Sequence, residues 1–306
     1  MDIFVTLLIK LIPLYILILL GYVGGKYLHI KNDSIATLLI DIIVPVVVFT
    51  GLITTEINLS TLSLPALFFF VCLFASLITY VISRIFWKDS TSNILSFIAG
   101  SGNTGYFGLP VAIALFGNSV IGQVAAVIIG TNLYMITIGY YIAAKGHHTV
   151  KESIMKVVKL PILYAFILGI LVNLAGIKLG KLYFDTASAF NGAYVVLGMM
   201  LIGLGLSDNK EFKIDLRFIG LSFIAKFLLW PSIVLLLLFI DHSTFKIFNP
   251  THYKVIMLMA IVPLAANVVS YAAILKSHTE KVSMAVLLST LFALFYIPLV
   301  AIFFLR

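Results

Sequence analysis

Charged residues are scarce in this chain. Asp, Glu, Lys and Arg together make up 10% of its 306 residues, and hydrophobic residues make up 62%. Soluble proteins carry about 25% charged residues, so this chain has too few charges to solvate the surface of a globule of its size. We therefore expect an integral membrane protein with most of its surface in contact with lipid.

Cysteine is also nearly absent. The single cysteine, Cys72, lies in an apolar run, which excludes a disulfide framework and a thiolate metal cluster. The chain has no His-Glu-x-x-His motif and no Walker lysine motif, so neither a zinc protease nor an ATP-driven pump is indicated. We expect no metal and no organic cofactor.

The net charge of +8 does not indicate a nucleic-acid partner. Nucleic-acid binding needs basic residues gathered on one polar face, whereas these lie in short gaps between apolar stretches. That arrangement is typical of loops at a membrane surface. We expect the lipid bilayer, and no nucleic acid, as the macromolecular environment of the chain.

Ten apolar stretches are each close to the length of about 20 residues that crosses a bilayer. Their approximate ranges are 4–23, 35–55, 65–86, 94–116, 120–143, 160–176, 187–206, 217–240, 253–275 and 283–305. The sequence therefore predicts an all-α integral membrane protein with ten transmembrane helices.

Basic residues are unevenly divided between the two sets of alternate loops. One set holds 13 of the 20 Lys and Arg residues, and the other set holds five. Loops rich in Lys and Arg stay on the cytoplasmic side. We therefore predict a multi-pass protein of the cell membrane with both termini outside and the central loop in the cytoplasm.

The central basic loop divides the chain into two halves. It covers residues 145–159, so that residues 1–144 and 160–306 each contain five predicted spans. Because five is odd, the second half enters the membrane from the opposite side. We interpret the halves as two five-helix repeats of inverted orientation, an arrangement common among secondary transporters.

A short spacing pattern recurs in the two halves. Pro13 and Gly21 are eight residues apart in the first span, and Pro161 and Gly169 are eight apart in the sixth. Both pairs are offset by 148 residues, as a repeat predicts. Chance recurrence in a glycine-rich membrane sequence is the alternative.

Two spans contain residues that interrupt a helix near its middle. Residues 98–110 of the fourth span hold four glycines, a Ser-Gly-Asn-Thr run and Pro110. The ninth span places Pro263 and Asn267 at the corresponding depth. Unwound backbone at membrane depth is tolerated only against protein or water, and paired broken helices indicate a transport site. The alternative is a pair of kinked, closely packed helices.

The ends of broken helices favour an anion. The N-terminus of a half-helix carries free N–H groups and partial positive charge, which suits a carboxylate. Asn103 and Asn267 add amides that can donate to an anion or accept from a cation. Asn132, in the middle of the fifth span, either lines the same cavity or forms a bond between helices.

Two ionisable residues lie deep within predicted spans. Lys226, in the eighth span, is predicted to balance helix C-terminal ends or an anionic substrate. Asp41, in the second span, is either a carboxylate that couples transport to protons or sodium or a partner in an interior bond. No cluster of His, Cys or carboxylates shares a membrane depth, so a membrane enzyme is disfavoured.

The motifs around these residues resemble the auxin efflux carrier family of secondary transporters. Residues 102–111, Gly-Asn-Thr-Gly-Tyr-Phe-Gly-Leu-Pro-Val, are similar to its Asn-x-Gly-x-x-Gly-x-Pro signature. The segments Pro263 to Asn267, 286–291 and Pro298-Leu299 resemble its C-terminal part, and 226–231 resembles its eighth helix. The resemblance covers the whole chain.

This resemblance implies two inverted repeats of five helices, crossing broken helices in spans four and nine, and an elevator-like movement. Bacterial relatives are linked to malate or malonate and plant relatives to auxin. The linker here is short, unlike the long central region of many plant members. The resemblance therefore favours a small mono- or dicarboxylate as the substrate. The coupling ion does not carry over.

We therefore predict a secondary active transporter of small organic anions, with a passive anion channel as the alternative. Whether the chain assembles as a homodimer is left open by the sequence. The predicted substrate-binding residues are Asn103, Thr104, Gly105, Pro110, Asn132, Pro263 and Asn267. The predicted residues for charge compensation or coupling are Lys226 and Asp41.

Overall fold

The computed structural model describes residues 3–304 except 55–58, 118–119, 147–148, 150, 153–154, 156–157 and 208–213. The gaps include part of the predicted linker at 145–159. Within the described residues the regular structure is helical, and the β-type contact is an isolated bridge between Gly102 and Leu264.

Six described helical segments are long and apolar enough to cross a membrane. They are 32–54, 63–86, 123–145, 181–205, 216–245 and 279–300. Large apolar side chains are exposed on outer faces, such as Leu168 and Phe239. Exposed apolar faces on long helices fit contact with lipid, as the all-α membrane prediction requires.

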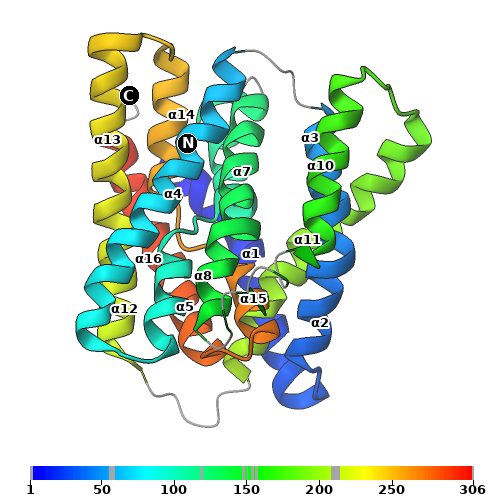
Figure 1. The fold of residues 1–306 in the computed structure, drawn as a ribbon, viewed down its shortest axis with the longest axis vertical. Coiled ribbons are helices and arrows are strands. Elements are labelled where there is room, and N and C mark those ends of the chain that lie inside the picture. The colour runs from blue at the N-terminus through cyan, green and yellow to red at the C-terminus, as the bar shows by residue number, and fades with distance from the viewer. Residues whose placement is uncertain are drawn as a thin grey trace.

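The helices form two bundles. In Figure 1, α2, α3 and α10 of the smaller bundle stand on the right, beside the larger bundle. In the smaller bundle, α1 packs along α11 and α10 packs along α3. Its elements are α1 (Ile3–Leu28), α2 (Asn32–Leu38), the π-helical turn η1 (Leu39–Ile43), α3 (Val44–Thr54), α10 (Pro161–Leu174) and α11 (Lys181–Ser207).

Glycines let the backbones of α1 and α11 touch within the smaller bundle. A Cβ on Gly21 would overlap the backbone of Met200, and one on Gly203 would overlap the carbonyl oxygen of Ile18. Close approach of this kind is how helices gain packing contact in lipid. The backbones of α1 and α11 therefore pack in direct contact.

The larger bundle contains the remaining helices, with α12 to α14 on the left of Figure 1. From the first half come α4 (Leu59–Phe86), α5 (Ser90–Ala99), η2 (Thr104–Gly108), α6 (Leu109–Phe116), α7 (Ile121–Tyr134), η4 (Met135–Gly139) and α8 (Tyr140–Lys145). From the second half come α12 (Leu216–Ile224), η5 (Ala225–Leu229), α13 (Trp230–Ile240), η6 (Asp241–Phe245), α14 (Pro250–Ala260), α15 (Val268–Ile274) and α16 (Thr279–Phe304).

Two helices of the larger bundle are interrupted, as the sequence predicts. The helical path stops after Ala99 of α5 and resumes at η2, and it stops after Ala260 of α14 and resumes at α15. Glycine weakens a helix, and Pro263 lacks the N–H that would continue one. The breaks lie within residues 98–110 and at Pro263 and Asn267, where the sequence predicts them.

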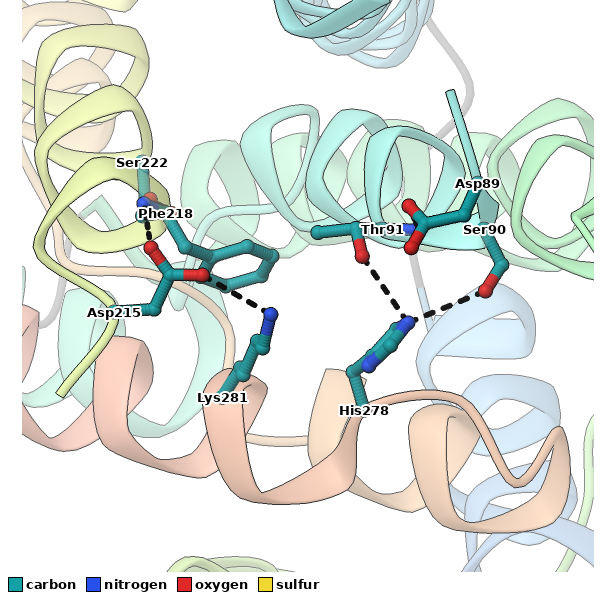
Figure 2. A network of polar contacts seen from close by, with 8 residues as sticks. All are labelled: Asp89, Ser90, Thr91, Asp215, Phe218, Ser222, His278 and Lys281. Atoms are coloured by element: carbon teal, nitrogen blue, oxygen red, sulfur yellow. Dashed lines mark hydrogen bonds and ion pairs between the residues drawn. The ribbon is translucent and has the colours of Figure 1, made fainter. Parts of the chain in front are cut away.

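A polar network joins three helix ends of the larger bundle beside the basic loops. Figure 2 shows Lys281 at the start of α16, whose Nζ donates to Oδ2 of Asp215 over 3.0 Å. In the preceding loop, Nε2 of His278 lies 3.2 Å from the hydroxyl oxygens of Ser90 and Thr91 on α5. The start of α16 is thereby fixed to α12 and α5.

Asp215 also caps α12, since its Oδ1 accepts from the backbone N–H of Phe218 over 3.0 Å. Burial alone would raise the pKa of this carboxyl group, but the Phe218 N–H and the Lys281 ammonium outweigh it and hold the pKa below its usual value. A group with a depressed pKa stabilises the folded state above its unfolded pKa, and that stability is lost as the pH falls through the folded value.

We predict that Lys281→Met lowers the free energy of unfolding by about 0.5–1 kcal/mol at pH 7, the range expected of a partly exposed ion pair. The difference from the wild type should shrink below about pH 4, where Asp215 becomes protonated. Denaturant unfolding of the purified protein at several pH values measures both the loss of unfolding free energy and its dependence on pH. Lys178→Met, at an exposed loop lysine, is the control, and a pH-independent loss in Lys281→Met would contradict the ion pair.

Candidate functional site

The two interrupted helices meet and pair through their backbones. The N–H of Asn103 donates to the carbonyl of Pro263 over 2.8 Å, and the N–H of Ala265 donates to the carbonyl of Ser101 over 3.4 Å. Between these bonds Gly102 and Leu264 face one another in antiparallel register. Each break therefore satisfies polar backbone groups that the other leaves free.

Asn103 occupies the position just before η2. Its Oδ1 accepts from the backbone N–H of Phe107 over 3.2 Å, which caps the start of the helical path through η2 and α6. The side chain is 2% exposed, and its buried Nδ2 has no hydrogen-bond partner. The site thus holds a free amide donor beside a helix N-terminus, where partial positive charge gathers.

Lys226 lies directly behind this crossing, on η5. Its side chain is fully buried, and its Nζ has no hydrogen-bond partner and lies 3.1 Å from the centroid of the Trp230 ring. The Trp230 Nε1 in turn donates to the carbonyl of Ala99 at the end of α5, over 2.7 Å. A cation–π contact of this kind stabilises a buried cation without neutralising it.

Lys226 packs against the backbone of Gly102 at the crossing. A Cβ on Gly102 would lie 2.9 Å from Nζ of Lys226 and 3.1 Å from the Trp230 ring. Gly102 also lines the cavity described next, so the lysine lies next to a residue of that cavity without lining it.

A small polar cavity lies at the crossing. Its volume is about 20 Å³, which is room for little more than one water molecule. The residues that line it are Gly102, Asn103, Thr104, Gly105, Tyr106, Ile128, Asn132, Met135, Tyr194, Ala265 and Asn267. It therefore collects the polar side chains of both broken helices.

A larger apolar cavity lies between the two bundles. Its volume is about 340 Å³, which is within the range of small-molecule sites. It is lined from the smaller bundle by Val44, Val47, Val48, Thr50, Gly51, Thr54, Asn191, Tyr194 and Val195. From the larger bundle it is lined by Gly105, Tyr106, Leu109, Ala125, Ile128, Ile129 and Asn132.

Most of the predicted site residues gather at these cavities. Asn103, Thr104 and Asn267 line the polar cavity, and Gly105 and Asn132 line both. The Thr104 hydroxyl also lies 3.1 Å from the hydroxyl of Thr131 on α7, which ties the broken helix to its neighbour.

The other predicted residues lie elsewhere. Pro263 contributes its carbonyl to the backbone pairing and lines neither cavity. Pro110 belongs to α6, and its side chain lies outside the described part. Asp41 is exposed on η1 and lines neither cavity.

The aromatic and apolar residues that line the two cavities were not predicted from the sequence. Tyr106 lies inside the glycine-rich motif, so its position in the motif was a usable signal. Tyr194 and Asn191 lie on α11, with no local pattern that marks them. They join the site only because α11 packs against the larger bundle.

We predict that Gly102→Ala destabilises the crossing. The new methyl group must displace Nζ of Lys226 or the Trp230 ring, and overpacking of this kind costs about 1–3 kcal/mol. Denaturant unfolding measures the loss. The matched control is Gly220→Ala, where nothing lies within 4 Å of the added Cβ and stability should stay level or rise. Equal stability of Gly102→Ala and the wild type would contradict this packing.

The chain also matches known proteins along nearly its whole length. A family model described as "Membrane transport protein" matches residues 6–301. An uncharacterized transporter of Methanocaldococcus jannaschii is 28% identical over 230 residues, which are 71% of this chain and 74% of the relative.

A second relative is the uncharacterized transporter YfdV of Escherichia coli K12. It is 24% identical over 288 residues, which are 88% of each chain. The family match covers both interrupted helices and the residues of both cavities. The chain therefore belongs to the membrane transport protein family, of the auxin efflux carrier type that its motifs resemble.

Proposed function

We propose that this protein is a secondary active transporter of organic anions. The observation that carries the proposal is the buried crossing, where a free amide donor and a helix N-terminus meet at one cavity and a lysine amine lies behind it against Gly102. In the proposed layout, residues 1–144 and 160–306 are inverted repeats of five transmembrane helices each. The equivalent places of the two broken helices in the two halves support it.

The charges around the crossing favour an anion. Nδ2 of Asn103 needs an acceptor, and buried donors left unpaired cost about 1–3 kcal/mol. The Lys226 amine has no carboxylate partner among the hydrogen bonds and ion pairs of the described residues. A carboxylate at the polar cavity would satisfy the amide and balance the lysine.

The shape of the cavities favours one carboxylate attached to an apolar body. None of the residues that line either cavity is charged, so a second carboxylate would be buried without a partner, which is costly. The wall of the larger cavity is mostly Val, Leu, Ile and Tyr side chains. Within the predicted class of small organic anions, we therefore favour monocarboxylates over malate-like or malonate-like dicarboxylates.

The boundary between the bundles is suited to sliding. Among the described residues, side-chain hydrogen bonds join helices within the smaller bundle or within the larger one, as Asn173 to Leu52 and Trp230 to Ala99 illustrate. A boundary that no such hydrogen bond crosses can shift without breaking polar bonds. Alternating access then follows from movement of the larger bundle against α3 and α11.

The larger cavity extends toward the end of the molecule that is remote from the basic loops. Thr54, at the end of α3, and Ala125, near the start of α7, line it, and both lie one span away from basic segments. With the basic loops in the cytoplasm, this arrangement faces outward, and both termini are outside the cell membrane.

We predict that Asn103→Ala reduces anion uptake at least about tenfold, the loss expected when one hydrogen bond to a charged group is removed. The assay is counterflow of a labelled monocarboxylate in proteoliposomes. Asn249→Ala is the matched control, because Asn249 also caps a helix, with Oδ1 accepting from His252 over 3.0 Å, yet it lines neither cavity.

Counterflow also separates the carrier from a channel. Acceleration of uptake by unlabelled substrate on the opposite side supports a carrier, whereas flux that neither saturates nor accelerates would contradict it. Wild-type rates in Asn103→Ala would show that the crossing is not the binding site.

A further inference from the structure

Two tyrosines stand between the polar and the apolar cavity. Tyr106 of η2 and Tyr194 of α11 each line both cavities. Their ring centroids are 3.8 Å apart with the ring planes inclined by 49°. They are the two ring-bearing side chains among the five residues that line both cavities, the others being Gly105, Ile128 and Asn132. The ring pair therefore forms part of the boundary between the cavities.

The pair is also a contact between the two bundles. Tyr106 belongs to the larger bundle and Tyr194 to the smaller one, and among the described residues it is the ring pair that joins them. Gly198, one turn along α11 from Tyr194, also packs against Tyr106, since a Cβ on Gly198 would lie 3.0 Å from the Tyr106 ring. The contact has to change when one bundle moves past the other.

The volume of the polar cavity limits what can bind there while the two rings are in contact. The polar cavity of about 20 Å³ is close to the size of one water molecule, so a carboxylate with its carbon chain does not fit there while the rings are in contact. Separation of the rings would merge that cavity with the larger one of about 340 Å³. The buried hydroxyl of Tyr106 has no hydrogen-bond partner, so no polar bond of that hydroxyl opposes its movement.

We propose that Tyr106 and Tyr194 form a gate across the path of the substrate. The closed gate shields Asn103 from the larger cavity, and an entering anion separates the rings before it reaches the crossing. Both tyrosines are positioning residues that control access, and the ring of Tyr194, rather than its hydroxyl, provides the closure. This inference rests on the proposed transport function for its role, but its geometry can be tested without substrate.

The experiment measures how fast a cysteine on each side of the gate reacts. In a Cys72→Ala background, Ala265→Cys places a thiol in the polar cavity alone, and Val47→Cys places one in the apolar cavity alone. An anionic methanethiosulfonate reagent is added to reconstituted protein, and mass spectrometry follows modification. Each cysteine is combined with wild-type Tyr194, Tyr194→Ala, Tyr194→Leu or Tyr194→Phe.

With Tyr194 in place, the thiol of Ala265→Cys should react at least about tenfold more slowly than that of Val47→Cys, because a minor open state is populated at about 10% or less. Tyr194→Ala or Tyr194→Leu should remove most of this difference without changing the rate at Val47→Cys. Tyr194→Phe should keep the slow rate, because the ring is retained. Two truncations are used so that a folding defect in one leaves the test intact.

Equal rates at Ala265→Cys with Tyr194 and with both truncations would overturn the gate. A fast rate in Tyr194→Phe would overturn the assignment of closure to the ring. These results do not depend on transport. If wild-type proteoliposomes took up no carboxylate at all, the proposed function would fail while the labelling result would stand.

Discussion

Backbone pairing between the two unwound segments is the interaction on which the rest of the site depends. An unpaired polar backbone group in the apolar interior costs several kcal/mol. The bonds from Asn103 to Pro263 and from Ala265 to Ser101 meet that need, so neither helix could break here without the other. The same pairing brings Asn103 and Asn267 to one cavity, although they lie in different halves of the chain.

The second constraint on the site is the absence of a side chain at residue 102. Because Gly102 has no Cβ, the Lys226 amine and the Trp230 ring can lie directly against the crossing. The ring holds the amine through its face and caps α5 through its N–H. A buried lysine behind a polar cavity, with an apolar cavity in front, fits the proposed substrate, an anion with one charge and an apolar body.

Sequence patterns predicted the parts of this site that depend on local chemistry. Glycine and proline at residues 98–110, and Pro263 with Asn267, marked the breaks because those residues weaken any helix, and Lys226 stood out as a charge in an apolar span. The wall formed by α3 and α11 could not be predicted, because Tyr194 acquires its role only through packing against Tyr106. Asp41 had the same sequence signal as Lys226 but lies exposed on η1, since the side of a helix that faces the site is decided by tertiary packing.

The most direct test of the account is the affinity of the purified protein for a carboxylate with and without the buried lysine. Isothermal titration calorimetry with a phenyl-bearing monocarboxylate compares the wild type with Lys226→Met, with circular dichroism as the check on folding. If the carboxylate balances Lys226, removal of the amine should weaken binding by about 100-fold or more, the cost of leaving a buried charge unpaired. Unchanged affinity in a folded Lys226→Met protein would contradict an anion site at the crossing.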